Sequence, residues 1–410
     1  MFYKIDYANQ NKGEVMIVYL DNSATTRQYD KVSDEMLKIM KENYGNPSSL
    51  HSIGLNAEKL IRGARKILAN SLGAKEEEVY FTSGGTESDN TVLQGIADAR
   101  KRSGKKIITS KVEHPAVLEA CKRLVEQGFE VEYIGVDKNC NLNIEELKSK
   151  ISSDTILISI MAVNNENGTI EPLRDIVQIK NDFNKNNGTD ILFHTDAVQS
   201  FGKMNMNIPG IDLISTSGHK IHGPKGVGGL YIRNHITMPA FIVGGGQEKH
   251  MRSGTENVPA IVGFGLAIDM AINDIQNRAE KMTNTRNYLL NGLKTELSDL
   301  KINSIETSST NGKERFCAPS ILNVSFLGTR GEVILHTLEQ DNIFVSTGSA
   351  CASNKKGQSH VLKAMGLTNE EIEGAIRFSF NEFNTIEEMD YVLEKVKIAV
   401  TKFRRLGSFR

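Results

Sequence analysis

The sequence predicts an α/β protein: a large part in which a mostly parallel sheet is sandwiched by helices, and a smaller α+β part. Between about residues 55 and 235, amphipathic helical stretches alternate with short runs rich in β-branched residues, the pattern of βαβ units. After about residue 260 this alternation gives way to a long helical stretch and then to a mixed segment. The length of 410 residues exceeds what one hydrophobic core usually serves, so two domains are expected.

The elements of the larger part are predicted from their periodicity. Apolar residues at helical spacing predict helices at residues 55–73, 85–101, 116–128 and 173–188. Short β-rich runs predict strands at residues 78–83, 106–110, 130–136, 155–163, 190–197, 211–217 and 226–232. Because strands and helices alternate along the chain, most neighbouring strands should run parallel, with helices on both faces of the sheet.

The smaller part begins with a long helical region from about residue 260 to 302. Strands are then expected at residues 321–326, 343–347 and 375–380, and helices at residues 332–341 and 359–366 and from Thr385 onward. We therefore expect a large domain at residues 26–260 and a small domain made of residues 1–25 and 261–410. Residues 1–15 precede the first patterned stretch and could be a dispensable extension.

The composition gives no electrostatic reason to expect nucleic acid or a membrane as a partner. The 49 basic residues nearly balance the 50 acidic ones, and the formal charge is −1. The N-terminus has no apolar run of the kind that a signal peptide needs. The four cysteines (Cys121, Cys140, Cys317 and Cys351) show no CxxC spacing, which fits a reducing compartment. We therefore expect a soluble, cytoplasmic protein.

The stretch "SGGTESDN", residues 83–90, follows a predicted strand and opens a predicted helix. Open α/β sheets bind ligands at the carboxyl ends of their strands. Free backbone N–H groups at this helix start, with the hydroxyls of Ser83 and Thr86, would suit a phosphate. The alternative is an ordinary capping box formed by Thr86 and Asp89.

Two other ligand classes fit the sequence poorly. "GHKIHGPKG" is not a nucleotide-binding P-loop, because Pro224 stands where that motif needs lysine. His219 and His222 resemble part of a metal site, but no cluster of Cys or His completes it. We therefore expect no metal.

An aspartate and a lysine follow two further predicted strands. Asp196 comes near the end of one strand, with Gln199 three residues later; its carboxylate could be a helix N-cap or could pair with a protonated ring nitrogen. Lys220 follows the strand at residues 211–217. It could be a surface lysine; if it is buried, desolvation lowers its pKa and makes it a Schiff-base amine. Phosphate loop, aspartate and lysine in this order are the parts of a pyridoxal phosphate site.

Cys351 lies in "STGSACASNKKG", residues 346–357, among residue types that are typical of loops. Taken alone, this stretch favours an unreactive thiol over a reactive one.

Many stretches in order resemble the NifS/IscS-like cysteine desulfurases, class V members of the pyridoxal-phosphate-dependent transferases of fold type I. The resemblance runs from about Val18 to the last helix. It is carried by "YLDNSATT", "NPSSLHSIG", "FTSGGTESDN", "VEHPAVLEAC", "VNNENGTIEP", "TDAVQSFGK", "STSGHKIHGPKGVGGLYI", "MRSGTENV", "ILNVSF", "STGSACAS", "SHVLKAMG" and "IRFSF".

The resemblance implies pyridoxal 5'-phosphate as cofactor and assigns the residues around its ring. Lys220 would hold the cofactor covalently and move protons. Asp196 would pair with the pyridinium nitrogen, and Gln199 would hydrogen-bond near the 3-hydroxyl. His114 would stack on the ring and could act as an acid or base; the alternative for it is a satisfied core histidine.

The resemblance also assigns the phosphate and substrate ligands. The phosphate would be held by Gly85, Thr86, Ser217 and His219, and by Thr255 of the other subunit in a homodimer. Arg377 would clamp the substrate carboxylate with its bidentate fork, helped by Asn165, which would also contact the cofactor. The alternative for Arg377 is a structural salt bridge.

The implied reaction converts L-cysteine to L-alanine and leaves a persulfide on Cys351, whose thiolate attacks the substrate sulfur. The persulfide would then serve an acceptor in iron–sulfur cluster assembly or tRNA thiolation. "ASNKKGQSH" departs from the usual segment ending in "EPSH", which leaves the acceptor open. Alternatives are a selenocysteine lyase, a class V transaminase or a non-catalytic binding protein. Cys351 argues against the transaminase, because amino transfer needs no thiol.

Overall fold

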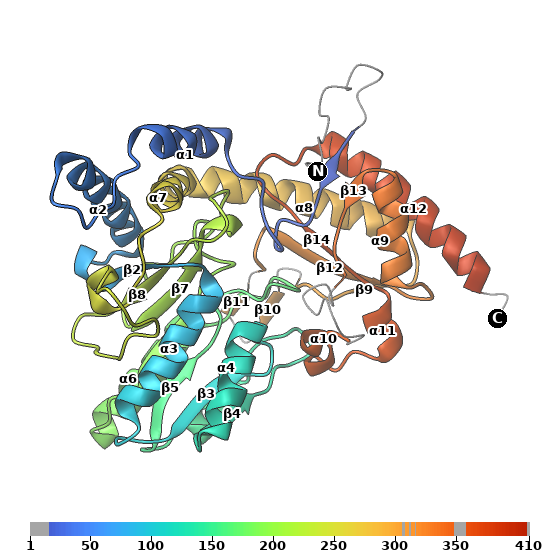
Figure 1. The fold of residues 1–410 in the computed structure, drawn as a ribbon. Coiled ribbons are helices and arrows are strands. Elements are labelled where there is room, and N and C mark those ends of the chain that lie inside the picture. The colour runs from blue at the N-terminus through green and yellow to red at the C-terminus, as the bar shows by residue number, and fades with distance from the viewer. Residues whose placement is uncertain (1–15, 306–307, 311–312, 316, 348–357, 408–410) are drawn as a thin grey trace.

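The structure is a computed structural model that describes residues 16–305, 308–310, 313–315, 317–347 and 358–407. Figure 1 shows a large sheet with helices on both faces and, beside it, a smaller group of strands and helices that ends in the C-terminal helix. This is the α/β architecture that the sequence predicts.

The large sheet has seven strands among the described residues, in the order β2-β8-β7-β6-β5-β3-β4. Its strands are β2 (Val79–Thr82), β3 (Lys106–Ser110), β4 (Glu130–Ile134), β5 (Thr155–Ser159), β6 (Leu192–Asp196), β7 (Leu213–Ser217) and β8 (Gly228–Ile232). The strands from β7 to β4 run parallel, whereas β8 runs antiparallel to both β7 and β2. A short loop without a crossover helix joins β7 to β8, and so short a connection favours antiparallel pairing.

Helices cover the sheet on two faces. One face carries α3 (Gly85–Arg100) and α4 (Pro115–Glu126), which pack with apolar residues of the strands in one hydrophobic cluster (Figure 1). The other face carries α1 (Asp30–Glu42), α2 (Ser52–Leu72), α5 (Ile144–Lys150), α6 (Leu173–Asn187) and α7 (Val258–Asn273) in a second cluster. Both faces are therefore buried, as expected for parallel strands.

The smaller group is built on a sheet of order β14-β12-β9. Its strands are β9 (Leu300–Ile302), β12 (Ile321–Phe326) and β14 (Ala375–Ser379), all antiparallel neighbours. A separate core joins these strands to α8 (Ile275–Glu296), α9 (Gly331–Gln340) and α12 (Ile386–Gly407). Shorter elements are β10 (Ser308–Thr310), β11 (Lys313–Arg315), β13 (Ile343–Phe344), α10 (His360–Ala364) and α11 (Asn369–Glu373).

The predicted long helical region at residues 260–302 is wrong in two details. It is two helices, α7 and α8, bent by 75° at a break. Asp274 between them has a non-helical backbone, and Asn and Asp favour helix ends over interiors because their side chains bond nearby backbone groups. Residues 300–302 are strand β9 rather than helix. Of the described helices, none is by itself long and apolar enough to cross a membrane, although α7 and α8 taken together meet that test of length and composition.

The N-terminal part of the described chain links the two groups. Strand β1 (Val18–Tyr19) pairs with β13, and Asp21 forms a bridge with Ser379 at the end of β14. The chain then crosses to the large sheet, where the Tyr29 N–H donates to the His222 carbonyl at 3.0 Å. Helix α7 packs against α1 and α2 in the core of the large sheet. The division into domains near residue 260 stays a prediction.

Candidate active site

The start of α3 forms an open cup of backbone groups. The N-cap is Gly84, and no side chain caps the helix, so the capping box of Thr86 and Asp89 is not formed. The φ of Gly84 is 153°, a conformation that side chains disfavour. A Cβ atom on Gly85 would lie 2.5 Å from Cγ2 of Val198, so a larger residue there would force the Val198 side chain to shift. Unsatisfied N–H groups at a helix start attract anions.

A pocket of about 430 Å³ lies at this cup. It collects four of the predicted phosphate ligands, Gly85, Thr86, Ser217 and His219, from α3, β7 and the turn after β7. The His219 ring bonds through Nδ1 to Thr25 Oγ1 at 3.2 Å. Burial, and then the charge of Lys220, lowers the pKa of His219 to about 4, so this ring is neutral near pH 7. The pocket thus has N–H and O–H donors suited to a phosphate.

Lys220 ends a short 3-10 helix, η2 (Gly218–Lys220), directly after β7. Its ammonium donates to the carbonyls of Ser23 and Ala24 at 2.6 and 2.7 Å. The side chain is half-buried rather than on the open surface. Gln199 also donates to the Ser23 carbonyl, at 2.9 Å. The N-terminal crossing segment therefore holds Lys220 and Gln199 next to each other.

Asp196 ends β6 and is 6% exposed. Its Oδ1 accepts from the Val198 N–H at 2.9 Å, a local turn rather than a helix cap. Burial raises the pKa of Asp196, while the charges of His114 and Lys220 lower it. These three predicted residues therefore lie within electrostatic range of one another, although they come from different strand ends. A buried carboxylate in this position suits a cationic ring nitrogen.

His114 is the N-cap of α4, and its Nδ1 accepts from the Ala116 N–H at 3.1 Å. Burial lowers the pKa of His114, and the charge of Lys220 adds to this, against the opposite effect of Asp196. Its position therefore combines a local capping contact with proximity to Asp196 and Lys220. A structural histidine could make the same capping contact through Nδ1, so the role of His114 in catalysis stays a prediction.

Arg377 lies on β14 and is 2% exposed. Nη1 donates to the Asn165 carbonyl at 3.0 Å, and Nη2 forms an ion pair with Asp21 at 2.8 Å. The salt bridge that was the alternative reading is therefore present. Among the described residues, however, the buried Nε of Arg377 has no hydrogen-bond partner. An unpartnered guanidinium N–H is costly and points to a ligand.

Two unpartnered buried atoms test the fit of pyridoxal phosphate. Within the described part of the chain, Ser23 Oγ is buried without a hydrogen-bond partner, as is Arg377 Nε. The Ser23 carbonyl holds Lys220, so this hydroxyl lies at the same end of the site. The cup at the start of α3 matches the phosphate of the cofactor, the buried Asp196 carboxylate matches its ring nitrogen, and Lys220 matches its aldehyde. The two unpartnered donors lie beside these groups. The residues fit this cofactor.

Ser23 and Asp21 are site residues that sequence reasoning missed. Their motif "YLDNSATT" contributed only to the overall resemblance. No local pattern marks them, because their partners Lys220 and Arg377 lie 197 and 356 residues away in sequence. The one feature of the sequence that could have pointed to Asp21 and Ser23 is that they are polar residues shortly after a short apolar strand.

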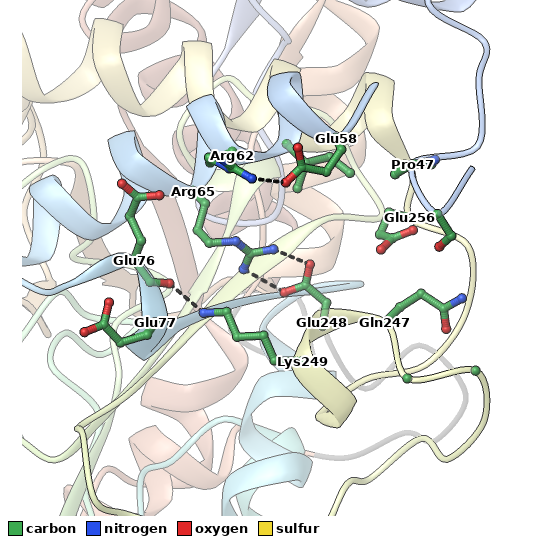
Figure 2. Close-up of a pocket in the computed structure, with 14 residues that line it drawn as sticks. Pro47, Glu58, Arg62, Arg65, Glu76, Glu77, Gln247, Glu248, Lys249 and Glu256 are labelled. Atoms are coloured by element: carbon green, nitrogen blue, oxygen red, sulfur yellow. Dashed lines mark hydrogen bonds and ion pairs between the residues drawn. The ribbon is translucent and has the colours of Figure 1, made fainter. Parts of the chain in front are cut away.

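Thr255 is exposed and lies outside the cup. It lines a neighbouring pocket of about 210 Å³ that shares Ser83 and Gly226 with the cup. Its segment is anchored by Glu248, whose carboxylate takes two hydrogen bonds from Arg65 (Figure 2). This chain by itself therefore does not bring Thr255 into the phosphate cup.

The pocket of about 460 Å³ in Figure 2 lies between α2 and the segment of Glu248. Lys249 on its edge donates to the Glu76 carbonyl at 2.8 Å. None of the predicted cofactor-binding or substrate-binding residues lines this pocket. It is therefore separate from the cofactor site.

Cys351 lies outside the described residues. The described chain resumes shortly before α10, where Ser359 caps the helix and donates from its hydroxyl to Glu166. His360 donates from Nε2 to the Glu113 carbonyl at 2.9 Å, next to His114. Glu166 follows Asn165, whose carbonyl binds Arg377. Ser359 and His360 are thus anchored on the two loops that carry His114 and Asn165.

The Glu166 carboxyl predicts a pH effect on stability. Burial raises its pKa from 4.5 to about 7, against the opposite effects of Ser359 and Arg377. Because the folded-state pKa lies above the unfolded value, the stability contribution is complete below pH 4.5 and is lost as the pH rises toward 7. Relative to the Glu166→Gln variant, the free energy of unfolding of the parent should fall by about 3 kcal/mol across this pH range. Denaturant unfolding at several pH values measures it.

The control for this prediction is Glu58→Gln, at an exposed ion pair with Arg62. Its pH profile should follow that of the parent, because exposed pairs contribute little. Parallel profiles for the parent and Glu166→Gln would contradict the prediction.

The family model described as aminotransferase class-V matches residues 18–392. The cysteine desulfurase IscS of Methanosarcina thermophila is 45% identical over 392 residues, which are 95% of this chain and 93% of the relative.

Solved structures agree with the sequence comparison. A NifS-like protein superposes with a TM-score of 0.86 at 40% identity, covering 94% of this chain and all of that one. A structure of SspA in complex with cysteine superposes with a TM-score of 0.76 at 32% identity, over 90% of this chain and all of that one. The chain belongs to the aminotransferase class-V family and, within it, to the NifS- and IscS-like cysteine desulfurases.

Proposed function

We propose that this pyridoxal-phosphate-dependent enzyme removes sulfur from L-cysteine, giving L-alanine and a persulfide on Cys351. The observation that carries the proposal is the convergence of Lys220, Asp196 and the phosphate cup at one end of the large sheet. It is supported by relatives named cysteine desulfurase and by the related SspA structure that contains cysteine.

The residues of the site divide the work of the reaction. When bound, the cofactor supplies an electron sink for the bonds around the substrate Cα. The α3 cup would hold the phosphate of the cofactor, and the Asp196 carboxylate would keep a proton on its ring nitrogen. Lys220 would provide the covalent anchor of the cofactor and, when not bonded to it, an amine that can carry a proton. Arg377, which is held by Asp21 and the Asn165 carbonyl, would bind the substrate carboxylate.

The sulfur leaves by attack of the Cys351 thiolate on the substrate sulfur. The S–S bond forms as the C–S bond breaks, and the electron pair of that bond stays with the product carbon. A proton then completes the methyl group of alanine. His114, which lies within electrostatic range of Asp196 and Lys220, would hold or pass that proton.

The assembly and partners extend this proposal. Thr255 would complete the phosphate cup of a second subunit, so the working form is a homodimer. The persulfide would pass to an acceptor protein, either an iron–sulfur cluster scaffold or a tRNA-thiolation enzyme. The reducing cytoplasm suits a solitary reactive thiol. The small domain of residues 1–25 and 261–410 would carry the Cys351 loop to the cofactor-binding domain at residues 26–260.

A product assay tests the function. With L-cysteine and a thiol reductant, we expect sulfide and L-alanine in equal amounts, and no amino transfer to added keto acids. Amino transfer without sulfide would establish the class V transaminase reading instead. A far larger kcat/KM for selenocysteine than for cysteine would establish the selenocysteine lyase reading. A protein that binds no cofactor would establish a non-catalytic role.

Arg377→Lys should mainly weaken substrate binding. Lysine keeps the charge but loses the bidentate fork, and hydrogen bonds to charged groups contribute about 1.5–3 kcal/mol. We therefore expect KM for L-cysteine to rise about 10- to 100-fold, with cofactor binding unchanged. Steady-state kinetics and the absorbance of bound cofactor measure both. An unchanged KM would show that the ion pair with Asp21 is the only role of Arg377.

A further inference from the structure

A buried lysine, Lys203, lies beside the cofactor site and has no part in the proposed mechanism. Lys203 is 7% exposed, and its ammonium points to Gln199 Oε1 at 3.5 Å. Within the described ranges, Lys203 forms no ion pair with a carboxylate. A buried lysine without a carboxylate partner is uncommon and calls for a reason.

Lys203 and Lys220 are joined by a short chain of hydrogen bonds. The Lys203 ammonium reaches Oε1 of Gln199, and Nε2 of the same amide donates to the Ser23 carbonyl at 2.9 Å. The Lys220 ammonium donates to that same carbonyl at 2.6 Å. One amide and one carbonyl therefore separate the two amines.

The charges facing Lys203 are mostly of its own sign. They come from Lys220, Arg278 and Arg377, with Glu382 as the opposing carboxylate. Glu382 is itself engaged by Arg278 at 2.8 Å. Burial, and then the charge of Lys220, lowers the pKa of Lys203 to about 7. A buried ammonium group and a half-buried one beside it cannot both stay charged at low cost in free energy.

We propose that Lys203 is a positioning residue for the proton of Lys220: it takes up a proton when Lys220 becomes neutral and gives it up when Lys220 is charged. Lys203 thereby keeps the charge of this buried end of the site constant while Lys220 changes state. The inference rests on the proposed role of Lys220 as cofactor anchor.

The proton balance of cofactor attachment shows what Lys203 does. When the Lys220 ammonium joins the aldehyde carbon, a C=N bond forms, water leaves and one proton is released. With the Lys220 charge gone, the main repulsion on Lys203 disappears, and Lys203 takes up that proton. When Lys220 is displaced and charged again, Lys203 returns to the neutral amine.

Proton release during cofactor loading tests the proposal. Pyridoxal phosphate is added to the full-length, cofactor-stripped chain near pH 7.5, and released protons are measured by calorimetry in buffers of different ionisation enthalpy. We expect Lys203→Met and Lys203→Arg to release up to one proton per chain more than the parent, because neither side chain can take one up. Ionisations of the cofactor itself are common to all three proteins. Equal release from the parent and both variants would overturn the proposal.

The reactivity of Lys220 separates charge from packing. The measured quantity is the rate at which the Lys220 amine of the cofactor-free chain is labelled, as a function of pH. The neutral Lys203 side chain of the parent is uncharged, as methionine is, so Lys203→Met should leave the pH midpoint of this labelling near that of the parent. Lys203→Arg keeps a permanent charge and should raise the labelling rate about tenfold below that midpoint. Reductive methylation with peptide mass spectrometry measures both rates. If the two variants shift the rate equally, the role of Lys203 is only structural.

Borohydride reduction of the cofactor-loaded protein shows which lysine holds the cofactor. It therefore separates a failure of the Lys203 proposal from a failure of the proposed function. The reduced cofactor should be found on Lys220 in the parent and in Lys203→Arg, and the arginine variant alone suffices if the methionine variant does not fold. Cofactor on another lysine would refute the proposed anchor. Cofactor on Lys220 with unaltered proton release refutes the Lys203 proposal alone.

Discussion

Lys220→Ala is expected to lower sulfide release from L-cysteine by at least about a thousandfold, because it removes both the covalent anchor and a proton carrier. The phosphate cup, Asp196 and Gln199 remain, so the variant should still bind cofactor, but without a covalent bond. Sulfide assays and borohydride reduction followed by peptide mass spectrometry measure the two effects. The reduced cofactor should be absent from the peptide that contains residue 220.

The matched control is Lys301→Ala, which removes a lysine from a partly exposed pair with Glu371 on the smaller sheet. Its activity should equal that of the parent, since such pairs contribute little. Sulfide release by Lys220→Ala within tenfold of the parent would refute the role of Lys220.

Cys351→Ala should separate sulfur transfer from cofactor chemistry. The variant keeps Lys220, Asp196 and Arg377, so it should bind cofactor, and the absorbance of the bound cofactor should still change when L-cysteine is added. It should lose persulfide and sulfide output to the background, because no thiolate remains to attack the substrate sulfur. Alkylation with mass spectrometry detects the persulfide, and a sulfide assay detects turnover.

Cys121→Ala is the control for the thiol. Cys121 is fully buried, and burial raises its pKa to about 12, so it carries no thiolate at neutral pH. We expect this variant to keep its activity and to lose some stability through the small cavity. Normal sulfide production by Cys351→Ala would mean that another group accepts the sulfur.

Much of the fold could be predicted from the sequence because its signal is local. The strands that end at Asp196 and Ser217 are short, fully buried and contain Phe, Ile and Thr, which favour strands, and the helices around them bury apolar residues against the sheet. Such patterns report which side of an element is buried. The break at Asp274 was missed because a polar residue in a helical stretch is compatible with either an exposed face or an end.

The sequence by itself determined the fold class and the identities of Lys220, Asp196, Arg377 and Cys351 as candidates, since strand ends and motif order are readable along the chain. Only the tertiary structure decided their neighbours. Lys220 is held by the carbonyl of Ser23, Arg377 by Asp21, and Lys203 is brought to Lys220 through Gln199. The physical reason is that periodicity records burial against solvent, whereas these contacts depend on how elements far apart in the sequence pack against one another.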